Sequence, residues 1–189
     1  MPNLYVIGGA NGAGKTTTAI KLLPDFLACN EYVNADAIAA GLSPFRPQSV
    51  ALQAGRLMIE RVHSLAKSNQ DFAFETTLAS RSFVPFLRQC RSGGYGVHVI
   101  YLWLQTVELA VERVRRRVAS GGHDIAETVI RRRYEAGRRN FVELYLPLAD
   151  TWQAFDNSAQ SYLPIAAGGS NLPTTINDQQ VWQSIIGLR

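Results

Sequence analysis

A glycine-rich segment near the start of the chain has the residue types that hold phosphate groups. Residues 9–16 match the pattern G-x-x-x-x-G-K-[ST], in which backbone N–H groups of a glycine loop point inward at phosphate oxygens. Lys15 adds a positive charge near the β- and γ-phosphates, and the Thr16 hydroxyl can ligate Mg²⁺. The segment therefore predicts a nucleoside triphosphate site formed by Gly9, Ala10, Asn11, Gly12, Ala13, Gly14, Lys15, Thr16 and Thr17.

Two acidic residues follow predicted strands and are candidates for proton transfer or metal binding. Asp36 follows the short strand predicted at residues 31–34, and Glu75 ends the strand predicted at residues 72–74. Ligands of an open parallel sheet bind beyond the carboxyl ends of its strands, so both acids are expected beside the glycine-rich loop. There, Asp36 can accept a proton from an attacking hydroxyl group. Alternatively, it caps the helix that is predicted to follow it.

Glu75 is followed by two threonines, and this polar group has two interpretations. The carboxylate can be linked to a bound metal ion, in the manner of an acid that ends an apolar strand of a nucleotide-binding protein. Alternatively, Glu75, Thr76 and Thr77 form a polar cluster that satisfies backbone groups of the loop. The sequence leaves both interpretations open.

Arginines are concentrated in two predicted helices, which are joined by residues 121–124. Valines at helical spacing take the buried face of the first helix, which leaves Arg113 and Arg117 projecting away from that face. On the second helix, Arg132 lies nearly opposite the predicted buried face. The two helices predict a hinged lid over about residues 113–145, whose guanidinium groups stabilise charge on a transferred phosphoryl group.

The alternative for these arginines is a solvated basic face that pairs with acidic neighbours. We expect most of these arginines to lie on such a solvated face and a few of them to contact phosphate. The acidic partners available in the same segment are Glu108, Glu112, Glu127 and Glu135.

The elements that must position these residues alternate between apolar runs and helical patterns. This alternation predicts a three-layer α/β fold, in which helices cover both faces of a mostly parallel, five-stranded sheet. The longest apolar run, residues 97–104, is expected to be a buried central strand. The glycine-rich loop lies between a strand predicted at residues 4–7 and a helix that Pro24 helps to end.

Several element boundaries carry local signals. One helix is expected to begin near Ser82 and another at Thr106, and Asp124 and Glu127 have the spacing of a capping box for the next helix. The remaining predicted elements are a strand at residues 151–156, a hairpin formed by residues 162–167 and 174–176 about residues 168–169, and a closing helix at residues 181–186.

Composition limits the class of protein. The chain has 189 residues, of which 47% are hydrophobic and 18% are charged, so we interpret residues 1–189 as a single P-loop domain. The net charge of +4 suits nucleic acid or small polyanions such as nucleotides. No apolar run is long enough to cross a bilayer, and the first residues lack the pattern of a secretion signal, so we do not expect one. Cys29 and Cys90 lack metal or redox spacing, so we expect free thiols in a cytoplasmic protein.

The chain resembles the zeta-toxin-like P-loop kinases, a branch of the adenylate-kinase-like fold. The resemblance extends from residue 4 to about residue 158 and is carried by the segments GGANGAGKTT, VNADAIAAGLSP, FAFETTLASR, RVRRRVASGGHDIAETVIRRRY and FDNS. It implies a core of five parallel strands, the use of ATP with Mg²⁺, and phosphoryl transfer to a sugar hydroxyl. UDP-N-acetylglucosamine is the best-known acceptor of that family.

Carried over by position, the resemblance implies roles for the matching residues. Lys15 and Thr16 would hold phosphates and Mg²⁺, and Asp36 would be the base. Glu75 and Thr77 would face the acceptor.

The resemblance also implies lid arginines, although the spacing of the arginine segment differs from that of the plasmid toxins. The candidates are Arg113 or Arg117 together with Arg132 or Arg133, of which we take Arg117 and Arg132 as the catalytic pair. The chain is shorter than those toxins. An antitoxin partner is possible, but no segment of the sequence indicates where it would bind.

These residues predict a small-molecule kinase that transfers the γ-phosphate of ATP to a hydroxyl group, with a sugar or nucleotide sugar as acceptor. One alternative is a nucleotide-dependent switch or ATPase, which would hydrolyse ATP without an acceptor and expose an apolar patch for a protein partner. Another is a polynucleotide end kinase. Because no basic and aromatic stripe lies outside the arginine segment, nucleic acid is not expected as a partner.

Overall fold

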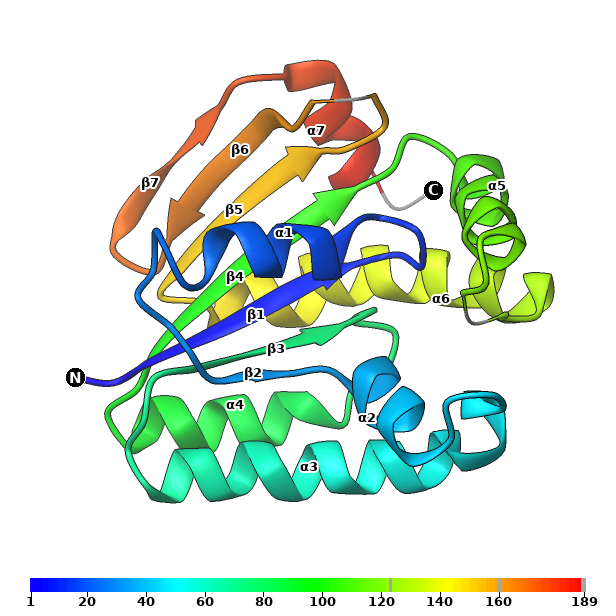
Figure 1. Cartoon of the computed structure of the whole chain (residues 1–189). Coiled ribbons are helices and arrows are strands. Elements are labelled where there is room, and N and C mark those ends of the chain that lie inside the picture. The colour runs from blue at the N-terminus through cyan, green and yellow to red at the C-terminus, as the bar shows by residue number, and fades with distance from the viewer. Residues whose placement is uncertain (123, 160, 188–189) are drawn as a thin grey trace.

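A computed structural model of the chain describes residues 1–122, 124–159 and 161–187. The helices and strands, in chain order, are β1 (Asn3–Gly9), α1 (Lys15–Leu22), β2 (Tyr32–Val33), α2 (Ala35–Leu42), the 3-10 helix η1 (Pro47–Val50), α3 (Ala51–Lys67), β3 (Phe72–Thr76), α4 (Phe83–Ser92), β4 (Gly96–Trp103), α5 (Val107–Ala119), α6 (Glu127–Asn140), the π-helix η2 (Phe141–Tyr145), the 3-10 helix η3 (Leu146–Leu148), β5 (Thr151–Asp156), β6 (Leu163–Gly169), β7 (Leu172–Ile176) and α7 (Gln179–Ile186). One twisted sheet runs through the molecule, with α1 in front of it and α6 behind it (Figure 1).

The strands of this sheet lie in the order β2-β3-β1-β4-β5-β6-β7. The first five are parallel, and β6 and β7 extend the sheet as an antiparallel hairpin. The predicted α/β fold around five parallel strands is confirmed, and the sheet formed by the described residues has seven strands. The hairpin turns at residues 170–171 rather than at residues 168–169, because Gly169 still pairs with Thr151 of β5.

The two faces of the sheet pack against different helices. Successive side chains of a strand point to opposite faces. Ile7 of β1 therefore lies in a small apolar cluster with Ala19 of α1. Leu4 and Val6 join the main core, which also contains buried residues of α3, α4 and α6 such as Ile130. These two clusters form the predicted three layers of helix, sheet and helix.

The carboxyl ends of three adjacent strands meet at one edge of the sheet, because β1, β2 and β3 are parallel. At this edge, β1 leads into the glycine-rich loop and β2 leads into α2. The edge therefore brings together the loop, Asp36 in the first turn of α2 and Glu75 near the end of β3.

Helices α5 and α6, which carry the arginines of the predicted lid, begin in different ways. Thr106 caps α5 as expected, since its side chain accepts a hydrogen bond from the backbone N–H of Leu109 (3.2 Å). The capping box predicted for α6 is wrong: Ala126 occupies the N-cap position without a side-chain bond, because the Glu127 carboxylate binds arginines instead. His123, in the linker between these helices, lies outside the described residues.

The inner face of α6 is part of the protein core. The buried Tyr134 donates a hydrogen bond to the backbone oxygen of Leu104 (2.6 Å), and Asn140 donates one to the backbone oxygen of Leu78 (2.7 Å). These contacts anchor α6 to the loops that follow β4 and β3. Helix α5 also has buried residues in the same core, so movement of the predicted lid stays a prediction.

Gly137 allows α6 to approach the loop after β3 closely. A Cβ atom at this position would lie 2.3 Å from the backbone oxygen of Thr77. Gly137→Ala is therefore expected to lower the free energy of unfolding by about 1–3 kcal/mol, as other overpacking substitutions do. Urea unfolding followed by circular dichroism measures this change.

The matched control for Gly137 is Gly55 in α3, where an added Cβ atom would have no neighbour within 4 Å. Gly55→Ala is expected to raise the free energy of unfolding by about 0.5–1 kcal/mol, because alanine loses less backbone entropy in a helix than glycine. Equal effects of the two substitutions would contradict the close approach of α6 to the loop.

Two further expectations concern membranes and thiols. None of the helices in the described parts of the chain is both long enough and apolar enough to cross a membrane. Cys29 and Cys90 are both buried free thiols, as their spacing predicts.

Candidate active site

The glycine-rich loop needs glycine where its backbone takes conformations that other residues rarely adopt. Gly12 and Gly14 have φ values of 78° and 85°. A Cβ atom at Gly14 would also lie 2.6 Å from Nδ2 of Asn157. That amide group donates a hydrogen bond to the backbone oxygen of Ala13 (2.8 Å), so the residue that follows β5 holds the loop in shape.

Lys15 is buried behind this loop, with 8% of its surface exposed. Its ammonium group donates a hydrogen bond to the backbone oxygen of Ala10 (3.0 Å). Burial lowers the pKa of Lys15, and the carboxylates of Glu75 and Asp36 oppose this shift. A buried cation beside the N-terminus of α1 attracts an anion such as a phosphate group.

A cavity of about 260 Å³ opens at the loop, and we call it the loop cavity. It collects predicted site residues from the loop, α1, α2, β3 and α5. Gly9, Ala10 and Ala13 do not line it, and the two alanines pack into the main core behind the loop. The residues that line the loop cavity are Asn11, Gly12, Gly14, Lys15, Thr16, Thr17, Asp36, Glu75, Arg113 and Arg117.

Asp36 lies in the first turn of α2, but another residue caps that helix. Oδ1 of Asn34 accepts hydrogen bonds from the backbone N–H groups of Asp36 (2.7 Å) and Ala37 (3.2 Å). The alternative in which Asp36 is the cap is therefore wrong. Asp36 is exposed, and it lines both the loop cavity and a second, larger cavity.

The larger cavity, of about 500 Å³, lies between α2, α3, the start of α4 and α6. Its lining is mainly apolar and includes Leu52, Met58 and Phe83. The charged residues in the lining are Asp36, Arg56 and Arg133. A space of this size is typical of sites for small organic molecules. We call it the acceptor cavity, after the role that is proposed for it below.

Glu75 lies against the threonine of the loop. One of its carboxylate oxygens accepts hydrogen bonds from the hydroxyl groups of Thr16 (2.8 Å) and Tyr32 (2.5 Å). Burial raises the pKa of Tyr32, and the charge of Glu75 adds to this effect, so the Tyr32 hydroxyl keeps its proton. Glu75 thus binds side-chain hydroxyl groups rather than loop backbone. The alternative, a polar cluster that satisfies the loop backbone, holds for Thr76, whose hydroxyl accepts a hydrogen bond from the backbone N–H of Leu78 (3.1 Å). A role of Glu75 beside a metal ion stays a prediction.

The surroundings of Thr16 fit a magnesium ion. The Thr16 hydroxyl donates its hydrogen to Glu75 and accepts one from Asn34, which leaves a lone pair on the oxygen for a cation. Within the described parts of the chain, no group of three His, Cys, Asp or Glu residues can hold a metal ion. Mg²⁺ would accordingly be held by Thr16 together with phosphate oxygens and water, which is a common arrangement for this ion.

Thr77 lines neither cavity. Its backbone oxygen packs against Gly137 of α6, and the following residue, Leu78, is fully buried with a φ value of 60°. Ser80, a little further along the same loop, lines the acceptor cavity instead. Contact between Thr77 and an acceptor stays a prediction.

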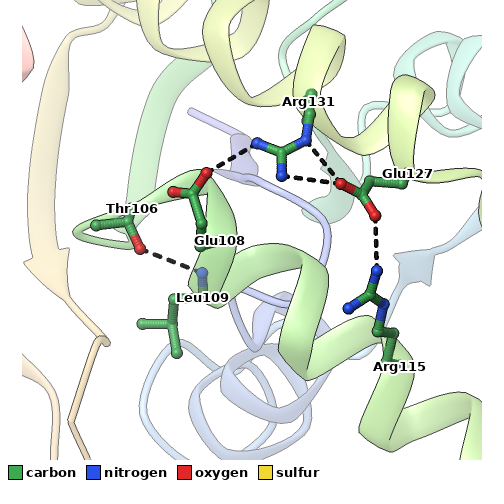
Figure 2. Close-up of polar contacts among 6 residues, drawn as sticks. All are labelled: Thr106, Glu108, Leu109, Arg115, Glu127 and Arg131. Atoms are coloured by element: carbon green, nitrogen blue, oxygen red, sulfur yellow. Dashed lines mark hydrogen bonds and ion pairs between the residues drawn. The ribbon is translucent and has the colours of Figure 1, made fainter.

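Several arginines of α5 and α6 form ion pairs with glutamates, as the alternative for this segment predicts. Arg131 binds Glu108 (2.9 Å) and Glu127 (2.8 Å), and Glu127 also binds Arg115 (2.7 Å), which joins the two helices (Figure 2). Hydrogen bonds from Arg131 lower the pKa values of both glutamates. Two more ion pairs join Arg116 to Glu112 and Arg138 to Glu135.

Other arginines lie at the two cavities. Arg113 and Arg117 line the loop cavity, and Arg113 donates a hydrogen bond to the backbone oxygen of Ser158 (2.9 Å). Arg133 lines the acceptor cavity, where burial lowers its pKa and the charge of Asp36 opposes that shift. Arg132 is exposed and lines neither cavity, because one residue along a helix turns a side chain by about 100°.

Comparison with known proteins connects this site to a family. A profile of the family described as zeta toxin matches residues 43–161, which include Glu75 and both arginine-bearing helices. The chain belongs to the zeta toxin family. The chain is also similar to an uncharacterised protein of Haemophilus influenzae, to which it is 34% identical over 128 residues. That alignment covers 67% of this chain and 88% of the relative.

Solved structures extend the comparison from the zeta toxin profile to the whole fold. The crystal structure of AvrRxo1-ORF1 and ORF2 with ATP matches with a TM-score of 0.75 at 17% sequence identity. The match covers 98% of this chain and 64% of the other, so this chain spans less than two thirds of that relative. A chain of the PezAT chromosomal toxin-antitoxin system of Streptococcus pneumoniae matches with a TM-score of 0.67 at 19% identity, over 100% of this chain and 80% of the other. At these identities, the likeness supports the predicted P-loop kinase architecture.

Sequence reasoning misses two residues that organise the site of this zeta toxin family member. Asn34 carries a usable signal, since an asparagine directly before an apolar helical segment is a typical N-cap. Tyr32 carries no such signal. Its contact with Glu75 arises because β2 pairs with β3 in a particular register, in which Tyr32 lies beside Ala73.

Proposed function

We propose that this protein is a kinase that uses ATP and Mg²⁺ and transfers the γ-phosphate to a hydroxyl group of a small molecule. One observation carries the proposal: Asp36 lines both the loop cavity and the acceptor cavity. A carboxylate between a phosphate-binding loop and a second cavity has the position that a general base needs in phosphoryl transfer.

The loop cavity is proposed to bind the triphosphate. Residues of the glycine-rich loop and Lys15 line that cavity, and their backbone N–H groups and the Lys15 ammonium group are proposed to hold the β- and γ-phosphates. Mg²⁺, when bound at Thr16, would supply positive charge to the same phosphates. Asn157 keeps the loop in its binding conformation through Ala13.

Asp36 is proposed to accept the proton of the acceptor hydroxyl. The hydroxyl oxygen forms a bond to the γ-phosphorus while the bond from that phosphorus to the β,γ-bridging oxygen breaks, and ADP leaves with the electron pair. Arg117, which lines the loop cavity, and Arg133, which lines the acceptor cavity, are proposed to stabilise the charge on the transferred group. Arg133 takes this role in place of Arg132, which lies away from both cavities.

The acceptor is proposed to be a sugar or a nucleotide sugar, as the zeta toxin family resemblance implies. The acceptor cavity is large enough for a sugar with an attached group. Arg56 and Arg133 in its lining can bind a phosphate group carried by such an acceptor. UDP-N-acetylglucosamine is therefore the first compound to test.

The two neighbouring arginines of α6 allow a matched test of this arrangement. Arg133→Gln is expected to lower kcat/KM by at least about tenfold, because it removes a partly buried positive charge beside Asp36. Arg132→Gln changes an exposed charge outside both cavities, and we expect kcat/KM to stay within about twofold of the original value. Steady-state kinetics with the identified acceptor measure both, and the reverse ranking would contradict the role of Arg133.

A protein partner is a second proposal. The PezAT relative belongs to a toxin-antitoxin system, and the AvrRxo1-ORF1 structure contains ORF2. Leu52 in the lining of the acceptor cavity is 85% exposed, and Phe45 is 97% exposed, so apolar side chains are available for a partner on α3 and on the segment before it.

A phosphoryl-transfer screen tests the proposed kinase activity. The protein is incubated with ATP, Mg²⁺ and a panel of sugars, nucleotide sugars, nucleosides and oligonucleotides, and new phosphate esters are followed by phosphorus NMR. We expect an ester to form with a sugar or nucleotide sugar. Rapid consumption of ATP without any ester would contradict the proposal and favour a switch or ATPase that binds a partner.

A further inference from the structure

Asn34 lies at the centre of a polar cluster that joins the glycine-rich loop to the helix that carries Asp36. Only 5% of its surface is exposed. Its Oδ1 atom accepts hydrogen bonds from the backbone N–H groups of Asp36 (2.7 Å) and Ala37 (3.2 Å). Its Nδ2 atom donates to the hydroxyl groups of Thr16 (3.3 Å) and Tyr32 (3.2 Å). Both ends of the amide are therefore fully used.

The backbone determines which way this amide points. The N–H groups of residues 36 and 37 can only donate hydrogen bonds, so the atom of Asn34 that faces them must be the oxygen. The nitrogen then faces the two hydroxyl groups and can only donate to them. The start of α2 thus sets the direction of every hydrogen bond in the cluster.

The same direction reaches the proposed metal ligand. Because the hydroxyl groups of Thr16 and Tyr32 accept hydrogens from Asn34, their own hydrogens are free for the Glu75 carboxylate, which accepts both (2.8 and 2.5 Å). Donation to Glu75 turns the remaining lone pair of the Thr16 oxygen away from that carboxylate. The lone pair is therefore kept available for a cation.

We propose that Asn34 is a positioning residue that presents the Thr16 hydroxyl to Mg²⁺ and fixes Asp36 relative to it, with Tyr32 holding Glu75 in place. The inference rests on the proposed function of this site. Asn34 connects the two halves of the reaction, because one end of its amide contacts the metal ligand and the other end holds the helix of the base. Groups that orient metal ligands in this way commonly change metal affinity by about 10- to 100-fold when they are altered.

Asn34→Ser separates this role from a purely structural one. Serine is as good an N-cap as asparagine, so α2 keeps its cap, but its shorter side chain loses the hydrogen bonds to Thr16 and Tyr32. Isothermal titration calorimetry measures the affinity for a slowly hydrolysed ATP analogue with Mg²⁺ and again in EDTA. The ratio of the affinity with Mg²⁺ to the affinity in EDTA is the gain from Mg²⁺. For Asn34→Ser we expect the affinity in EDTA to stay within about twofold of that of the original protein. We expect the gain from Mg²⁺ to be about tenfold smaller than in the original protein.

Tyr32→Phe gives a second test that leaves the cap of α2 intact. It removes one of the two hydroxyl groups that hold Glu75, and we expect a smaller loss of the gain from Mg²⁺ than in Asn34→Ser. Its matched control is Tyr5→Phe, because Tyr5 and Tyr32 both lie beside Ala73 in the register of the sheet. Tyr5 stacks on His98, away from the cluster, and its substitution is expected to leave the gain unchanged.

The outcomes distinguish the inference from the function on which it rests. If the original protein binds the magnesium nucleotide and neither Asn34→Ser nor Tyr32→Phe reduces the gain from Mg²⁺, the positioning role is wrong while the proposed kinase stands. An equal loss of affinity with Mg²⁺ and in EDTA would mean that the cluster only supports the fold, and it would also overturn the inference. If the original protein binds no nucleotide, the proposed function and the inference fail together.

Discussion

Asp36→Asn is expected to lower kcat for phosphoryl transfer by about 100- to 10,000-fold, which is the contribution of a general base. Asparagine has the same size as aspartate but cannot take up the proton of the acceptor hydroxyl. The fold should be unaffected, because Asn34 rather than Asp36 caps α2. Steady-state kinetics measure the rate, and calorimetry is expected to show an affinity for the magnesium nucleotide within about twofold of the original.

The control for this substitution is Asp25→Asn, which removes an exposed acid that lines neither cavity. Its kcat is expected to equal that of the original protein. Transfer at the original rate by Asp36→Asn would show that the base has been assigned to the wrong residue, whatever the control does.

Lys15→Met is expected to lower kcat by about 100- to 1,000-fold, because it removes a charged donor from the transferred phosphoryl group. It should not reduce stability. Burial lowers the pKa of Lys15, which means that the folded protein holds the charged form of this side chain at a cost. Methionine fills similar space without a charge, so we expect an equal or higher melting temperature in differential scanning calorimetry.

Lys21→Met serves as the control, since Lys21 is an exposed lysine in the last turn of the same helix. It should retain full activity. A Lys15→Met protein that melts at a much lower temperature and transfers phosphate at the original rate would contradict both the burial argument and the role of this lysine.

The parts of the fold that could be predicted from sequence are those with strong local signals. These parts include the glycine-rich loop, strands β3 and β4 on either side of β1, and the cap at Thr106. Each depends on residues nearby in the sequence, and each is present in the structure. Spacing alone predicted a capping box for α6 that the structure does not have. Whether Glu127 caps its helix depends on competition from Arg115 and Arg131, and Arg115 comes from the neighbouring helix.

The site was predictable to the extent that strand ends determine it. Asp36 follows β2 and Glu75 lies near the end of β3, and these strands are parallel, so the approach of both acids to the loop is a consequence of sheet topology. Strand ends do not determine whether Arg132 or Arg133 lines the acceptor cavity, so this choice could not be predicted from the sequence. A rotation of one residue decides which arginine meets the acceptor cavity, and that rotation depends on how Tyr134 and Gly137 pack α6 against the loops after β4 and β3.

A crystal structure with Mg²⁺ and a slowly hydrolysed ATP analogue tests the central claim most directly. The terminal phosphate is expected in the loop cavity, in contact with Lys15, with the Asp36 carboxylate between it and the acceptor cavity. A terminal phosphate that faces away from the acceptor cavity, or an Asp36 carboxylate turned out of both cavities, would contradict the account.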